Sequence, residues 1–378
     1  MMTIYQHGGY AMNNSSRRDA IKVGLGGAAL AMLPLPSGPA RAQVGQTLKG
    51  PLKVIIHCHT VGKAEDIALF KESAGIETNV SCFTTNTDVL TRMVAGAGRQ
   101  FDAYTMNIQF LKPVIQRGLA APQDWSKIPN TKNMLPMFKN PLNSTIDGKH
   151  YSLPWMFGYD SVIYNRDVIP ECDSYAVLFD DKYAGRVTMR DDPQFSIIIV
   201  ALYMQKPNPL SLNSKDLKEI SDFLIKKKKN FRSLWSGFAE PVSLMKSGEV
   251  VAVGQGWIPI YRELKKSGMN VGFALLKEKV TSWTQDLVIP PQAMERGMAD
   301  SVYAFMNWVI GPEMGARMGR SVGYVSPSGA ALSLLSPAEA QEIGYDDIEK
   351  VWRNSLPVTE FPDNLQEWND AWSRFKAA

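Results

Sequence analysis

The sequence predicts an α/β protein built from two lobes, each a doubly wound sheet flanked by helices. Strand-like and helix-like segments alternate over residues 52–118, which is the pattern of a parallel sheet with helical crossovers. A second set of strands and helices begins near Ser161. The chain has 378 residues, more than a single core usually holds. We therefore expect two lobes rather than one.

The first lobe opens with a continuous apolar and largely β-branched run, Leu52–His59, which indicates a buried parallel strand. Two of the helices that follow carry hydrophobic residues at helical spacing. The expected strands cover residues 52–59, 78–83 and 101–106, and the expected helices cover 64–74, 88–97 and 111–118.

The segment Tyr151–Gly158 breaks this alternation and leads into a strand at Ser161–Asn165. Later strands are expected at 186–189, 250–254, 271–275 and 283–290, and helices at 196–205, 217–226, 242–247, 300–310, 337–344, 346–354 and 364–375. Ligands of open α/β sheets bind beyond the carboxyl ends of the strands. Because the chain crosses between the lobes more than once, that region is a cleft between them.

The N-terminal residues 1–42 have the features of an export signal. Arg17 and Arg18 precede an uncharged Gly/Ala/Leu run, and Ala40-Arg41-Ala42 follows it. This pattern is typical of a twin-arginine signal peptide that is cleaved near Ala42 and directs the protein to the periplasm. The apolar run is shorter than the ~20 residues that span a bilayer. The alternatives are an ordinary Sec signal or an uncleaved anchor.

Removing this signal changes the charge balance. The whole chain has a formal net charge of +4, and residues 1–42 contribute +3 of it, from four basic residues and Asp19. The mature chain is thus near +1, which gives no global electrostatic reason to expect a nucleic-acid partner. The sequence contains neither a Gly-x-Ser-x-Gly elbow nor a phosphate loop. We expect no cofactor and no enzymatic activity.

The cysteine count is odd, so at least one of Cys58, Cys82 and Cys172 is unpaired within the chain. Cys58 and Cys82 fall near the ends of two neighbouring predicted strands. A disulfide between these two is one option, and three free thiols are the other.

Four sequence blocks carry a resemblance to a known family. In their order and spacing they resemble the extracellular (periplasmic) solute-binding proteins of ABC importers, in particular the spermidine/putrescine-binding branch. The resemblance covers essentially all of the mature chain. The blocks are Tyr151–Gly158 with Tyr164-Asn165, Leu244–Val250, Trp283–Pro290 and Val322–Pro327.

The resemblance implies a periplasmic-binding-protein clamp of type II. Lobe 1 would consist of residues 43–153 and 283–325, and lobe 2 of residues 154–282 and 326–378. A protein of this family captures a small solute, here a polyamine or another amine, and delivers it to a permease in the inner membrane. We expect it to work as a monomer.

The resemblance also points to aromatic contact residues. In the polyamine-binding branch, rings enclose a methylene chain and carboxylates receive the ammonium ends, and each contact of a cation with a ring face contributes ~0.5–2 kcal/mol. Trp257 and Trp283 fall close to binding tryptophans of that branch, and Phe110 lies in a loop that carries a binding ring. Trp155 and Tyr159, in the first crossover, either contact the ligand or pack at the hinge.

The acidic positions match the branch less well. Gln285 stands where the branch has an amine-binding acid. Asp286 is one position later, which on a strand means the opposite face unless a bulge intervenes. Asp192 matches an acidic position, but Phe195 replaces the second acid of that loop. Asp160 is an additional acid, which restores a negative charge, caps a helix or meets an arginine. A monoamine, an amino acid derivative or another small polar solute therefore fits as well as a polyamine.

An enzyme is the alternative from a different class. His57 and His59 flank Cys58 at the end of the first strand, where alternate residues share a face. Such a pair binds metal in some hydrolases, so an exported metal-dependent hydrolase using His57 and His59 is the second hypothesis. A catalytic zinc needs three protein ligands, and His150 is the only other histidine of the mature chain. In a solute-binding protein, His59 would instead form a wall of the cleft.

Overall fold

A mixed sheet of ten strands runs through residues 41–378, which form one compact unit. Eight strands lie in the order β2-β1-β3-β11-β6-β9-β7-β8, while β10 pairs with β6 and β12 with β11. Their bounds are β1 Leu52–His57, β2 Thr78–Phe83, β3 Ala103–Asn107, β6 Leu153–Asn165, β7 Val187–Arg190, β8 Phe231–Trp235, β9 Ala252–Gly256, β10 Val271–Phe273, β11 Val280–Val288 and β12 Ser355–Pro357. The computed structural model describes residues 48–57, 64–83, 85–141 and 143–378.

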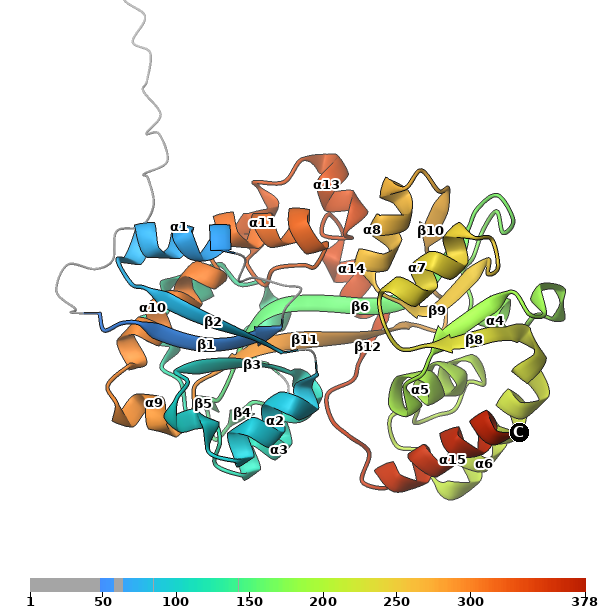
Figure 1. The fold of residues 1–378 in the computed structure, drawn as a ribbon, viewed down its shortest axis with the longest axis horizontal. Coiled ribbons are helices and arrows are strands. Elements are labelled where there is room, and N and C mark those ends of the chain that lie inside the picture. Colours follow the sequence, from blue (N-terminus) through green and yellow to red (C-terminus); the bar gives the residue numbers. More distant parts are fainter. Residues whose placement is uncertain (1–47, 58–63, 84, 142) are drawn as a thin grey trace, which may run out of the picture. The chain divides into compact units, whose positions relative to one another are not determined.

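The sheet has two halves, and the long strands β6 and β11 connect them (Figure 1). In the first half, β1 pairs in parallel with β2 and β3, and β11 runs antiparallel to β3. In the second half, β7 pairs in parallel with β8 and β9. Strand β6 pairs with β11 at one end and with β9 and β10 at the other.

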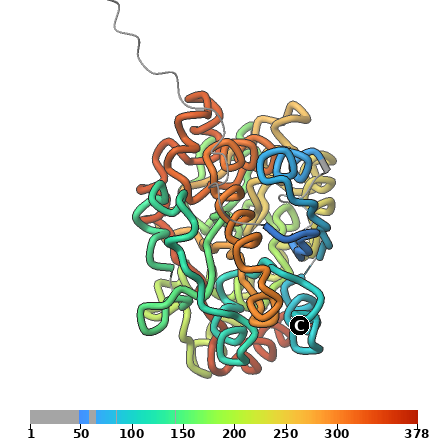
Figure 2. Tube along the Cα trace, turned by 90° about the vertical axis from the view of Figure 1, so that its left-hand side faces the viewer, coloured from blue at the N-terminus to red at the C-terminus, as the bar shows by residue number. Residues whose placement is uncertain are grey.

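Helices cover both faces of the first half, which explains why β1 is apolar on both sides. Ile55 belongs to a core with Val89 of α2 and Leu111 of α3, whereas Val54 and Ile56 belong to the main core with residues of α1 and α10. Figure 2 shows the orange segment with α9 and α10 beside the blue and cyan N-terminal segments. The helices are α1 Ala64–Ala74, α2 Asn86–Val94, α3 Leu111–Gln116, α9 Pro291–Glu295, α10 Ala299–Val309 and α11 Pro312–Val322.

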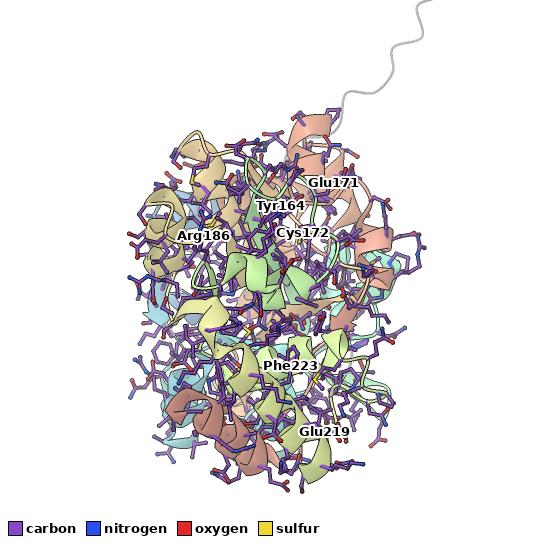
Figure 3. All side chains as sticks on the ribbon, turned by 90° about the vertical axis from the view of Figure 1, so that its right-hand side faces the viewer. Tyr164, Glu171, Cys172, Arg186, Glu219 and Phe223 are labelled. Atoms are coloured by element: carbon purple, nitrogen blue, oxygen red, sulfur yellow. The ribbon has the colours of Figure 1, made fainter. Side chains whose placement is uncertain are left out.

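The second half is covered in the same way. Helices α7 and α8 share a core with Ile163 and Val253, and α5, α6 and α15 pack together on the other face. Figure 3 views this end, where Phe223 of α6 packs edge-on against Phe179 with ring centroids 5.0 Å apart. The helices are α4 Ala176–Phe179, α5 Pro193–Tyr203, α6 Ser214–Lys227, α7 Ala239–Lys246, α8 Ile258–Lys266 and α15 Leu365–Ala377.

The C-terminal segment contacts both halves. Helices α12 (Gly329–Leu332) and α13 (Pro337–Glu342) pack against α11, which itself packs against α10 of the first half. Helix α14 (Ile348–Arg353) precedes β12, and α15 then lies on α5 and α6 of the second half. The residues just after 325 thus pack with first-half helices, although the sequence predicts them in the second lobe.

The predicted start of one strand is wrong. The sequence predicts a strand only over Ser161–Asn165, whereas Leu153–Asn165 form the single strand β6. Pro154 lies where the register between β6 and β11 shifts, and a proline is tolerated at such a bulge. Gly158 pairs with Trp283 of β11, where the absence of a side chain leaves room for the indole.

Several elements lie where the sequence pattern predicts none, including β8, α8, α11 and β12. Helix α11 contains Gly315 and Gly319, which weaken a helical pattern read from sequence. A Cβ on Gly315 would lie 2.6 Å from the Oγ of Ser326, so the glycine permits close packing on the following loop. This gain in packing compensates for the low helix propensity.

Two predictions lie partly outside the described residues. Residues 1–42, with the predicted export signal and its cleavage site, are outside them, and so are Cys58 and His59. Cys82 is exposed on β2. Among the described residues, none of the helices combines the length and the apolar character needed to cross a membrane.

Candidate solute-binding site

A cavity of about 1370 Å³ lies between the two halves of the sheet. Parallel strands end at it, as expected for an open α/β sheet. His57 ends β1, Asn107 ends β3, Arg190 ends β7, and Trp257 directly follows β9. The lining includes most of the predicted site residues, namely Phe110, Asp160, Asp192, Trp257, Trp283 and Gln285.

Asp160 is the deepest acid of the cavity, with 1% of its surface exposed. Its Oδ1 accepts a hydrogen bond of 3.0 Å from Nε1 of Trp283, and its Oδ2 lies 3.8 Å from the guanidinium of Arg190. Burial raises the pKa of Asp160 to about 7, because desolvation of the carboxylate outweighs the attraction of Arg190 and the hydrogen bond from Trp283. A cationic solute beside Asp160 would favour the charged form.

The indole of Trp283 lies across the partner strand. It occupies the space beside Gly158, where an added Cβ would approach the ring to 2.4 Å. Tyr324 packs edge-on against the indole, with ring centroids 5.0 Å apart. Burial also raises the pKa of the Tyr324 hydroxyl far above its usual range. Trp283 is therefore fixed by packing on the wall of the cavity, with its N–H directed at Asp160.

Asp192 serves the fold as well as the cavity. It is the N-cap of α5, and its Oδ1 accepts a hydrogen bond of 3.0 Å from the backbone N–H of Phe195. Its Oδ2 lies 3.4 Å from Arg190. Asp192 is more accessible than Asp160, since 24% of its side chain is exposed. Its capping role explains why this acid begins the helix.

Arg190 lies between these two acids and three aromatic rings. The centre of its guanidinium is 5.1 Å from the ring centroid of Trp257, 5.5 Å from that of Phe195 and 6.0 Å from that of Trp235. Trp235 and Trp257 pack edge-on, with centroids 5.0 Å apart. Trp257, one of the rings that the sequence predicts for a bound amine, thus already lies beside a cation of the protein.

The wall from the first half is aromatic and amide-rich. Phe110 packs edge-on against Phe361, with ring centroids 4.8 Å apart. Gln109 and Gln285 line the cavity, and the side-chain oxygens of both are buried without a hydrogen-bond partner among the described residues. The amide groups of this wall can therefore offer a ligand neutral polar contacts.

The predicted placement of Asp286 is confirmed. A register shift does occur between Gln285 and Asp286, but Asp286 is not among the residues that line the cavity. It is fully buried and accepts a hydrogen bond of 2.6 Å from Oγ of Ser152. Burial raises its pKa to about 6. Asp286 therefore does not supply the carboxylate that is missing at Gln285.

Two predicted site residues lie away from the cavity. Trp155 and Tyr159 are neighbours in sequence of the cavity residues Met156 and Asp160, and adjacent residues of β6 face opposite sides. Both belong to the main hydrophobic core, and Tyr159 packs edge-on against Phe273 with centroids 5.3 Å apart. The structure thus places them in packing positions.

Arg190, Phe195 and Tyr324 line the cavity but were not predicted as ligand contacts. The signal for Arg190 was its position at the end of a strand and two residues before a helix cap. Tyr324 follows the left-handed Gly323, at the end of α11, and that helix is absent from the predicted elements.

The histidines give little support for a metal centre. His57 lines the cavity and packs edge-on against Phe83, with centroids 5.3 Å apart. No group of three or more His, Cys, Asp or Glu side chains that could hold a metal occurs in the part of the chain that the structure describes. His59 lies outside that part.

Comparison with known proteins decides the family. The profile of the bacterial extracellular solute-binding proteins matches residues 67–342. The chain belongs to this family. Its members bind solutes rather than catalyse reactions, so the main function hypothesis is supported and the hydrolase hypothesis is not.

Curated relatives of this solute-binding protein include periplasmic proteins of Escherichia coli and Pseudomonas aeruginosa. It is 25% identical over 296 residues to the putrescine-binding periplasmic protein PotF of Escherichia coli K12, covering 74% of this chain and 78% of the relative. It is 24% identical over 327 residues to the putrescine-binding periplasmic protein SpuD of Pseudomonas aeruginosa, covering 82% and 87%.

Solved structures confirm the predicted fold class of this solute-binding protein. The spermidine/putrescine ABC transporter substrate-binding protein PotD of Streptococcus pneumoniae superposes with a TM-score of 0.75 at 22% identity, covering 86% of this chain and 98% of that one. The α/β clamp expected from the sequence is therefore the fold of this chain.

Proposed function

We propose that this protein is the periplasmic solute-binding component of an ABC importer and that it captures a small amine-containing solute, for which polyamines are the first class to test. The observation that carries the proposal is the cavity itself, which is lined by the rings of Trp257, Trp283 and Phe110 together with the carboxylates of Asp160 and Asp192. The names of the curated relatives, which bind putrescine or spermidine, support the same solute class.

In this proposal the solute enters while the lobes are apart, and the lobes then close over it by bending at the crossing strands. Ring faces contact the methylene chain and any ammonium group, and Asp160 accepts charge-assisted hydrogen bonds. Gln285 contributes a neutral hydrogen bond in place of an acid. His59, just beyond the cavity residue His57, is proposed as a further wall, and Trp155 and Tyr159 support the site from the core.

Replacing Trp257 by alanine tests this site. We expect Trp257→Ala to weaken amine binding about tenfold or more, because one ring contact and its shielding of the site are lost. The measurement is the shift in melting temperature that putrescine, spermidine and monoamines cause in the purified protein. Trp125→Ala is the matched control, because Trp125 stacks on His150 away from the cavity. An unchanged shift in Trp257→Ala would remove this tryptophan from the site.

The proposed location rests on the export signal. We propose that residues 1–42 are a twin-arginine signal, cleaved near Ala42, and that the mature monomer meets its permease at the inner membrane. Replacing Arg17 and Arg18 by lysines should stop periplasmic accumulation of a tagged chain, as measured by cell fractionation. Normal accumulation of the double lysine variant would favour the Sec alternative.

A further inference from the structure

Arg190 is a cation of the cavity whose hydrogen-bonding capacity is unused. Only 25% of its side chain is exposed, yet its guanidinium donates no hydrogen bond to any of the residues that the structure describes. A guanidinium carries five N–H donors in a planar fork. The residue is half-buried and lines the cavity, and its nearest acceptors are carboxylate oxygens at 3.4 and 3.8 Å. Its N–H donors can therefore bind an acceptor that a solute brings into the cavity.

Arg262, on the same cavity, shows what a structural arginine looks like. It donates 3.1 Å from Nε to Glu342, 2.9 Å from Nη1 to the carbonyl of Gly319 and 2.7 Å from Nη2 to the carbonyl of Arg320. Its fork is satisfied by α11 and α13. The two arginines therefore differ in role, and Arg190 is the one that remains able to bind a ligand.

The acids near Arg190 do not satisfy it. Asp192 lies 3.4 Å away while one of its oxygens caps α5, and Asp160 lies 3.8 Å away while it accepts the bond from Trp283. Both distances exceed the 2.7–2.9 Å of charge-assisted hydrogen bonds. A planar anion with two oxygens can reach the fork with the geometry that these side chains lack.

The same arrangement disfavours a dication. Arg190 lies over the ring of Trp257 and shares the field of both acids. Gln285 adds no charge on the opposite wall. A second ammonium would therefore face a fixed positive charge, whereas Asp160 remains available to a first one.

We propose that the solute carries a carboxylate as well as an amine, and that the carboxylate binds the guanidinium of Arg190 through two hydrogen bonds. This inference rests on the proposed function and narrows its solute class from amines in general to amino-acid-like zwitterions. The ammonium group of such a solute lies toward Asp160, and its methylene groups lie against Trp257 and Trp283.

Calorimetric titration with matched compounds tests the inference. Three ω-amino acids with four, five and six carbons are compared with the α,ω-diamines of equal carbon number, so that each pair differs only in one end group. We expect the amino acid to bind about tenfold or more tightly than the diamine in at least one pair. Preference for the diamine in every pair would overturn the inference but leave the proposed function standing. Absence of binding by all six compounds would overturn the proposed amine-binding function and the inference with it.

Variants of Arg190 test the contact itself. Arg190→Gln should lower the affinity for the preferred amino acid about tenfold or more, and it should leave the affinity for the matched diamine unchanged or raise it. Arg190→Lys keeps the charge without the fork and should lose only part of the affinity, which covers the case in which Arg190→Gln does not fold. Arg353→Gln, on a side chain 70% exposed, is the matched control. The proposed contact would be contradicted if Arg190→Gln lost affinity for the amino acid and the diamine equally while the melting temperature of the free protein stayed unchanged.

Discussion

At the residue scale, two of the buried acids, Asp160 and Asp286, have different surroundings. Asp160 faces the cavity and Asp286 faces Ser152. Burial raises the pKa of the first to about 7 and that of the second to about 6. Each therefore holds its proton in the folded state at pH values where the unfolded chain has released it.

The difference in the pKa of Asp160 between the folded and the unfolded chain predicts how stability depends on pH. Above pH 4 the unfolded state loses the proton while folded Asp160 retains it, so the free energy of unfolding falls as pH rises to about 7 and then levels off. The contribution is at most roughly 4 kcal/mol, at ~1.4 kcal/mol per pH unit. In thermal melts from pH 4 to 8, Asp160→Asn should gain stability relative to the wild type over this range.

Asp286→Asn is the matched variant for that experiment, and its relative gain should end near pH 6. If the difference in melting temperature between Asp160→Asn and the wild type stayed constant with pH, it would contradict the raised pKa of Asp160.

At the element scale, helix α5 connects stability to the cavity through its N-cap residue, Asp192. Asp192 caps the helix and also lies 3.4 Å from Arg190, so one side chain fixes both the start of α5 and the field around the guanidinium. Asn213 caps α6 in the same way, by accepting 3.0 Å from the backbone N–H of Asp216. Only the first of these two caps lines the cavity.

The two caps give a matched pair of substitutions. Asp192→Ala and Asn213→Ala should each lower the free energy of unfolding by about 1 kcal/mol, the usual cost of a lost N-cap. Asp192→Ala alone should also change the affinity for amine ligands, as measured by calorimetry alongside chemical denaturation. Asp192→Asn should keep most of the stability, because the amide oxygen can still cap. If Asn213→Ala changed the affinity equally, the effect would come from general destabilisation.

At the scale of the whole molecule, β6 and β11 are long strands that pair with each other and belong to both halves of the sheet. Strand β12 adds to β11. The cavity lies between the halves, so a change in their separation changes the contact of both walls with a solute. A clamp of this kind closes by small rotations in the connecting strands.

Closure predicts a change in size that can be measured in solution. The radius of gyration from small-angle X-ray scattering should fall when a tightly bound amine saturates the protein, because the two halves approach each other. Trp257→Ala at the same ligand concentration should show a smaller fall. A radius that does not change while calorimetry reports saturation would contradict the clamp mechanism.

Much of this molecule could be predicted from sequence. Hydrophobic patterns defined the alternation of β1, β2 and β3 with α1, α2 and α3, because these patterns are local. Only the second part of β6, Ser161–Asn165, is predictable, since Pro154 and Gly158 weaken a strand pattern unless a partner strand accommodates them. Helix α11 was missed because the advantage of Gly315 lies in packing against Ser326, a contact absent from the local sequence.

The residues of the candidate site were likewise only partly predictable from sequence. Trp257, Trp283 and Asp192 are predictable because they lie near strand ends or match family positions. Asp160 is predictable only as an additional acid that could restore a negative charge, and all four residues line the cavity. The role of Arg190 could not be predicted, because it depends on the distances between its guanidinium and the nearest carboxylates in the folded chain. That property exists only once the rings and acids are assembled around it.

The tryptophans around Arg190 have one more consequence. Trp235 and Trp257 lie edge-to-face beside the guanidinium, and Trp283 donates its N–H to Asp160. The emission of an indole depends on the charges and solvent next to it, and a solute that binds here changes both. We therefore expect the intrinsic tryptophan emission of the protein to change when a solute binds, so that binding can be followed in real time without an attached dye.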